Sequence, residues 1–127
     1  MIKQLLLIFI GGGLGSVSRY LMGLFVHKIV QVAFPIGTLL VNVLGSFLIG
    51  FIYALFLKEA INHDVRLFLA IGFCGGFTTF SSFSFDSLQL LRNGQTLAFA
   101  GYIIASILLC FLFVWLGDYL GKIMFSK

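Results

Sequence analysis

The apolar stretches of this chain are too long and too close together for a protein that folds in water. Of its 127 residues, 61% are hydrophobic and 9% are charged, and the mean hydropathy is +1.15. Soluble domains carry a charge on roughly a quarter of their residues, and a small core cannot hide the excess apolar surface. A transmembrane helix needs about 20 apolar residues. The sequence therefore predicts an integral membrane protein with room for four crossings and no soluble domain.

Turn signals divide the chain into four helices within a single membrane domain, residues 1–127, and the expected fold class is all-α. The helices are expected at about 3–26, 35–57, 65–91 and 96–124. Pro35 suits the first turn of the second helix, where its missing N–H is not needed. Asn93 and Gly94 form a strong turn signal before the fourth helix. His27 and His63 are interpreted as loop residues.

The expected third helix contains GFCGGFTTFSSFSFDS, residues 72–87, which combines glycines, hydroxyl groups and phenylalanines. The glycines weaken a helix, and the Thr-Thr and Ser-Ser pairs can bond the backbone locally. We therefore predict a break between about Gly75 and Thr79. Non-helical backbone at membrane depth is tolerated where it is buried in protein or lines a cavity. The carbonyl groups freed by such a break are natural ligands for a cation.

Small residues recur every four positions in the first helix. Gly11, Gly15 and Arg19 share one face. Glycines at this spacing let helix backbones approach closely, so we predict a packing face there. A charge inside a membrane helix is costly and usually faces protein or water, although a residue near the helix end can reach the interface. Arg19 therefore either lines a vestibule or lies at the membrane surface.

Uncharged polar side chains mark one face of the second helix and one face of the fourth. Thr38 and Asn42 are four positions apart, and Tyr102 and Ser106 repeat this spacing. Polar groups without partners are costly in lipid, so these faces are expected to meet protein. The carboxamide of Asn42 carries two N–H donors and no charge. Asn42 therefore either makes a bond between helices or donates to an anion.

Phe80 and Phe83 follow the expected break and share one helix face, together with Thr79 or Ser84 according to the register. A phenyl ring has a positive edge. Ring edges interleaved with hydroxyl groups can stabilise an anion without a fixed positive charge. These residues predict an uncharged polar pathway for an anion.

Other classes of function lack the residues that they need. The chain has no nucleophile beside a base, no carboxylate pair and no phosphate-binding loop, so we do not expect an enzyme. The net charge of +4 is small and scattered, so we expect no nucleic-acid partner. Cys74 and Cys110 are interpreted as small buried thiols. Asp86 is the one candidate carboxylate for proton-coupled transport, and we expect it toward the far end of the third helix.

Basic residues are divided almost evenly between the two sides of the membrane. The side with both termini carries Lys3, Lys58, Arg66, Lys122 and Lys127, and the other carries Lys28, Arg92 and, at the interface, Arg19. A bias this weak permits insertion in both orientations. An antiparallel dimer is therefore compatible with the sequence.

Three segments resemble, in order and spacing, the signatures of the Fluc (CrcB) fluoride channel family. They are GGGLGSVSRY, PIGTLLVNVLGSF and GFCGGFTTFSSFS, of which the third is the specific one. The resemblance covers essentially the whole chain. It implies an antiparallel, dual-topology homodimer with two fluoride pathways. The protein would be a multi-pass protein of the cell (inner) membrane, with fluoride, lipid and its own second copy as partners.

The resemblance also implies roles for individual residues. A structural sodium ion at the dimer centre would be held by the backbone carbonyls of Gly75 and Thr78 from both subunits. The anion pathway would be lined by two pore phenylalanines, a pore asparagine, a vestibule arginine and a polar track, here Phe80, Phe83, Asn42, Arg19, Thr38, Thr79, Ser81, Ser84, Tyr102 and Ser106. Asp86 is shorter than the glutamate that the resemblance implies at its place, so the chain departs from the family pattern at this position.

The expected function is a passive, fluoride-selective channel that exports fluoride down its electrochemical gradient. One alternative is a small multidrug or guanidinium exporter, which has similar size and four crossings. Such exporters share a glutamate in the first helix, and the first helix here has no acidic residue. A second alternative is a non-transporting subunit of a larger membrane complex, against which the broken third helix and its paired phenylalanines argue.

Overall fold

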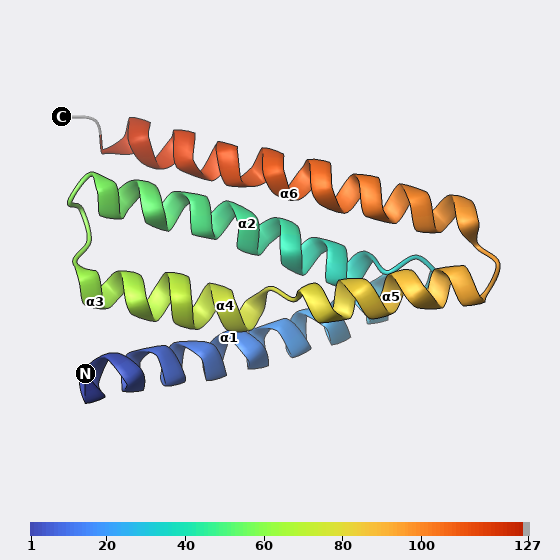
Figure 1. Ribbon diagram of the computed structural model, residues 1–127, viewed down its shortest axis with the longest axis horizontal. Helices are drawn as coiled ribbons and strands as arrows, with labels where there is room; N and C mark the ends of the chain where they lie inside the picture. The colour runs from blue at the N-terminus through green and yellow to red at the C-terminus, as the bar shows by residue number, and fades with distance from the viewer. Residues whose placement is uncertain (126–127) are drawn as a thin grey trace.

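The computed structural model describes residues 1–125, and this range is helical throughout apart from short connections (Figure 1). Its elements are α1 (Ile2–Ile29), α2 (Ile36–Leu57), α3 (His63–Arg66), the π-helical η1 (Leu67–Cys74), α4 (Gly75–Phe77), α5 (Phe80–Arg92) and α6 (Thr96–Met124). Four spans are long and apolar enough to cross a membrane, namely α1, α2, His63–Arg92 and α6. Both ends of the described chain lie at the same end of the molecule, as four crossings require.

Three helix ends differ from the sequence expectation. The first helix continues to Ile29, so His27 lies in its last turn and not in a loop. His63 is likewise helical, as the first residue of α3. Pro35 is the N-cap residue before α2 and lies outside its first turn. The structure has Gly94 at φ 70°, the left-handed conformation that glycine adopts without strain, in the turn before α6.

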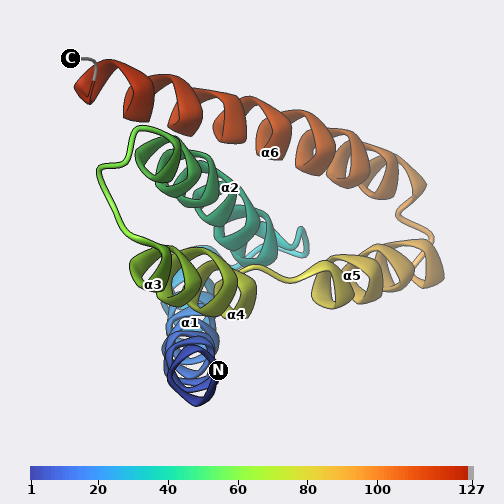
Figure 2. The same cartoon turned by 60° about the vertical axis from the view of Figure 1, so that its left-hand side comes forward.

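Glycines bring the four spans together in two close pairs, α2 with α6 and α1 with η1 and α4 (Figures 1 and 2). A Cβ atom added at Gly11 or Gly15 would collide with the backbone of η1, at the carbonyls of Phe68 and Phe73. The packing face predicted for these two glycines is therefore confirmed. Gly117 allows the same close approach between α6 and α2, because a Cβ atom added there would collide with the Phe47 carbonyl of α2.

The third span is not one continuous helix. Thr78 (φ −79°, ψ 157°) and Thr79 (φ −152°, ψ 117°) have extended backbone between α4 and α5. The Thr79 hydroxyl accepts a 3.1 Å hydrogen bond from the amide of Ser82 and so caps the start of α5. After this point α5 leaves the direction of α4 and α1 and runs toward α6 (Figure 2).

The outer surface of the molecule is apolar on the faces away from these contacts. Phe9 of α1 is 78% exposed, and Phe111 of α6 is also 78% exposed. A surface with so many large exposed apolar side chains is stable in lipid and not in water. The structure thus agrees with a multi-pass membrane protein.

Candidate functional site

Two cavities lie on either side of Thr79. The first, the Arg19 cavity, has a volume of about 340 Å³ and lies between α1, the 30–35 connection, α2 and α5. The second, the Phe83 cavity, has a volume of about 350 Å³ and lies between α2, residues 78–83 and α6. Thr79 contributes to the wall of both. Its side chain is 8% exposed, so this shared wall is tightly packed.

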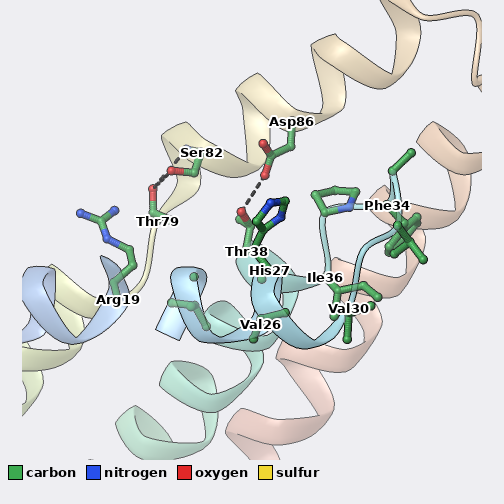
Figure 3. A pocket seen from close by; sticks show the side chains of 16 residues that line it. Arg19, Val26, His27, Val30, Phe34, Ile36, Thr38, Thr79, Ser82 and Asp86 are labelled. Atoms are coloured by element: carbon green, nitrogen blue, oxygen red, sulfur yellow. Dashed lines mark hydrogen bonds between the residues drawn. The ribbon is translucent and has the colours of Figure 1, made fainter. Parts of the chain in front are cut away.

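Opposite charges line the Arg19 cavity from different helices. Figure 3 shows Arg19 reaching in from α1 and Asp86 from α5. The Asp86 carboxylate accepts a 2.6 Å hydrogen bond from the Thr38 hydroxyl and a 3.4 Å hydrogen bond from the Tyr102 hydroxyl. The ion pairs of the described residues join Lys3 to Asp64 and Lys122 to Asp118, so within residues 1–125 the Arg19 guanidinium is free of a carboxylate partner.

Aromatic rings and neutral donors line the Phe83 cavity. The Phe80 and Phe83 ring centroids are 5.5 Å apart, and Phe83 continues to Tyr102 at 5.2 Å. Ser106 of α6 is 7% exposed, and its Oγ has no hydrogen-bond partner among the residues that the structure describes. A buried hydroxyl without a partner is costly. The Phe83 cavity therefore holds an unused donor beside two phenyl rings.

The carboxamide of Asn42 binds both backbone groups of Thr79. Asn42 Oδ1 accepts a 2.8 Å hydrogen bond from the Thr79 amide, and Asn42 Nδ2 donates a 3.0 Å hydrogen bond to the Thr79 carbonyl. One N–H of Asn42 is left over, because the group has two. The sequence left open whether Asn42 bonds another helix or an anion, and the structure shows that it bonds the third span.

Two backbone amides near the interruption bond to side chains instead of to helix carbonyls. In a continuous helix the Thr79 amide would bond the Gly75 carbonyl, and the Ser82 amide would bond the Thr78 carbonyl. Here the first amide bonds Asn42 and the second bonds the Thr79 hydroxyl. The carbonyls of Gly75 and Thr78 thereby lose their usual partners. Carbonyl oxygens of this kind are suitable ligands for a hard cation such as sodium.

The comparisons with known proteins agree with this architecture. The model of the CrcB-like protein family, Camphor Resistance (CrcB), matches residues 6–118. The chain belongs to the CrcB-like family. The resemblance inferred from the sequence motifs is thereby confirmed.

Proteins named FluC from several bacteria are similar to this chain over nearly its full length. It is 52% identical over 120 residues to the fluoride-specific ion channel FluC of Phocaeicola vulgatus, which covers 94% of this chain and 99% of the relative. It is 49% identical over 123 residues to FluC of Bacteroides fragilis, with 94% and 97% covered. FluC of Rhizobium meliloti is 47% identical, with 96% and 98% covered. These relatives are named as ion channels and not as enzymes.

The remaining residues singled out by the CrcB-like motifs lie outside the two cavity walls. Ser81 and Ser84 are exposed on α5, where the Ser84 hydroxyl donates to the Phe80 carbonyl at 3.0 Å. Tyr102 is fully buried and contacts the cavities only through its neighbours, Asp86 and Phe83. The structure therefore joins Tyr102 to Asp86 and Ser81 to the Thr79 hydroxyl, at 3.2 Å, but leaves Ser84 apart from these polar contacts.

Sequence reasoning missed several residues of the cavity walls, and two of them, His27 and Cys110, had a signal in the sequence. His27 lines the Arg19 cavity, and its position eight after Arg19 continues the four-residue spacing of the first helix. Cys110 lines the Phe83 cavity and is half-buried, so its interpretation as a buried thiol is wrong; Cys74 is 1% exposed, as expected. Cys110 follows Ser106 by four positions, which was the available signal.

Proposed function

We propose that this protein is a fluoride-selective passive ion channel. Its relatives are named as fluoride-specific ion channels, and that of Phocaeicola vulgatus is 52% identical over 94% of this chain. The observation that carries the proposal is the Phe83 cavity, in which the unpartnered Ser106 hydroxyl lies beside Phe80 and Phe83. A small anion in this cavity would receive a hydroxyl donor and the positive edges of phenyl rings.

The proposed path leads from the Arg19 cavity past Thr79 into the Phe83 cavity. Burying a bare ion in a medium of low dielectric costs tens of kcal/mol, so fluoride must exchange its water for protein donors step by step. Arg19 raises the local concentration of anions at the entrance. The donors beyond it are neutral, so fluoride is bound weakly enough to leave again, which conduction requires. Selection against chloride would follow from a narrow path rich in donors.

The proposed assembly is an antiparallel homodimer with two pathways. Phe80 is 79% exposed, although it forms part of the wall of the Phe83 cavity. A second copy of the chain would cover this ring and close the cavity against lipid. The near-even distribution of basic residues supports insertion in both orientations.

The proposed sodium site consists of the Gly75 and Thr78 carbonyls from both subunits. The residues fit a cation because the amides of Thr79 and Ser82 bond to side chains and leave these carbonyls available. A Cβ atom added at Gly75 would meet no atom within 4 Å, so the side-chain position of this residue is open. Bound sodium would supply positive potential near the anion path and tie the subunits together.

Fluoride efflux from liposomes that contain the purified protein alone tests this proposal. A fluoride electrode records efflux, chloride efflux is recorded in parallel, and protein-free liposomes give the background. We expect rapid loss of fluoride without loss of chloride. An absence of fluoride efflux from folded, inserted protein would overturn the channel and favour an exporter of organic cations or a subunit that needs a partner.

A further inference from the structure

We propose that Asn42 is a positioning residue for the cation site, because it diverts the Thr79 amide away from the Gly75 carbonyl. The proposal rests on the sodium site of the proposed function and deepens it. Asn42 itself would touch no cation. Its carboxamide would fix the backbone conformation in which the carbonyls of α4 remain available as ligands.

The geometry of Thr79 explains why one side chain can do this. The residue has extended backbone, and in an extended residue the N–H and C=O point to the same side, as they do in a hydrogen-bonded pair of a β-ladder. A primary carboxamide offers an acceptor and a donor at matching separation. Asn42 thus makes the 2.8 Å and 3.0 Å hydrogen bonds that a neighbouring strand would make.

Removing these two hydrogen bonds would favour closure of the helix. A Thr79 amide at membrane depth must find an acceptor, and the carbonyl four residues earlier, on Gly75, is the nearest regular one. Closure would give the Gly75 carbonyl an amide partner in place of a cation. Asn42 therefore acts on the cation site through Thr79.

Sequence context makes Asn42 suited to this role. The adjacent turn of α2 carries Gly45, where an added Cβ would collide with the Thr78 side chain. The absence of a side chain at Gly45 lets α2 approach the extended residues closely enough for the short Asn42 side chain to reach.

The test compares the acceptor with the donor of Asn42 in two variants. Asn42→Leu removes both hydrogen bonds at similar volume, and Asn42→Asp keeps the acceptor for the Thr79 amide but loses the donor. Thermal unfolding of each purified variant in detergent is measured across a sodium chloride series, with N-methylglucamine chloride to hold ionic strength constant. Asn93→Leu, in the exposed turn before α6, is the matched control.

We expect sodium to stabilise the wild type, the Asn93→Leu control and Asn42→Asp at similar concentrations. For Asn42→Leu we expect the half-maximal sodium concentration to rise by about tenfold or more, as for residues that orient metal ligands indirectly. Fluoride flux should fall in both Asn42 variants. A purely structural role would lower the unfolding temperature of Asn42→Leu by the same amount at every sodium concentration.

An unchanged sodium response in Asn42→Leu would overturn the positioning role. If Asn42→Leu does not fold, Asn42→Ala provides the second measurement, because it removes the same two hydrogen bonds without adding apolar volume, and its sodium response should weaken in the same way. Failure of sodium to stabilise a wild type that still conducts fluoride would remove the cation site and this inference with it. Wild type that is stabilised by sodium but conducts no fluoride would count against the channel alone.

Discussion

The Thr38 hydroxyl and the Asp86 carboxylate are 2.6 Å apart, and their hydrogen bond joins α2 to α5 beside the Arg19 cavity. The Tyr102 hydroxyl of α6 reaches the same carboxylate oxygen at 3.4 Å. Asp86 is therefore the point at which three helices meet. Because α5 begins after the interruption and leaves the direction of α4, this network helps to fix its position.

Replacing Thr38 by valine should loosen this network. Valine keeps the shape of threonine but removes the donor, so Asp86 would retain only the longer bond from Tyr102. A hydrogen bond to a charged group contributes about 2 kcal/mol, and we expect a loss of that order in the free energy of unfolding. Unfolding of the purified variant in detergent measures it. Thr96→Val, at the exposed start of α6, is the control, and equal stability of both variants would contradict the role of the Asp86 network.

Phe80→Ile and Phe83→Ile should slow fluoride flux while leaving the fold intact. Isoleucine keeps the apolar volume but has no positive ring edge. Loss of an aromatic contact of about 1 kcal/mol would slow flux roughly fivefold if it acts on the barrier. Phe85→Ile is the control, because Phe85 is exposed on the same helix and lies outside both cavity walls. Wild-type flux in both test variants would remove these rings from the pathway.

Arg19→Gln should reduce fluoride flux mainly at low ionic strength. A free positive charge in a cavity attracts anions, and such steering contributes about tenfold or more in rate. The effect should shrink as salt is raised, since the screening length falls from about 10 Å at 0.1 M to about 3 Å at 1 M. Flux is measured at the same fluoride gradient at low and at high salt concentration. Arg92→Gln, at the exposed end of α5, is the control. A loss of flux that is equal at both salt concentrations would indicate that Arg19 acts by direct contact with the anion and not by long-range electrostatic attraction.

The four membrane spans and the packing glycines can be predicted from the sequence, because the length of an apolar segment and a four-residue spacing are both local signals. The hydrogen-bond partner of Asn42, in contrast, could not be predicted from the sequence. A carboxamide can bond a helix, a break or an ion, and only the approach of α2 to Thr79 selects among them. The same reason applies to Ser81 and Ser84, whose exposed positions depend on the direction in which α5 leaves the interruption. Such directions follow from contacts between distant segments and leave no periodic signal.

The two cysteines offer a direct comparison between the Phe83 cavity and the core. Cys110 lines the cavity, whereas Cys74 is 1% exposed and packs against Ile52 and Ala70. Mercuric chloride is small and uncharged, and it replaces the thiol proton of cysteine to give a sulfur–mercury bond, releasing a proton and a chloride ion. At Cys110 this adduct would fill part of the proposed path. We therefore expect mercuric chloride to block fluoride efflux, and excess thiol to restore it.

The variants Cys110→Ser and Cys74→Ala separate the two sites. Cys110→Ser keeps a small polar side chain in the wall of the cavity, so it should conduct fluoride and resist mercury. Cys74→Ala should remain as sensitive as the wild type, because its Cys110 is intact. Mass spectrometry of the treated protein checks that the adduct is on Cys110. An adduct on Cys110 that leaves fluoride efflux unchanged would mean that the Phe83 cavity lies beside the anion path and not on it.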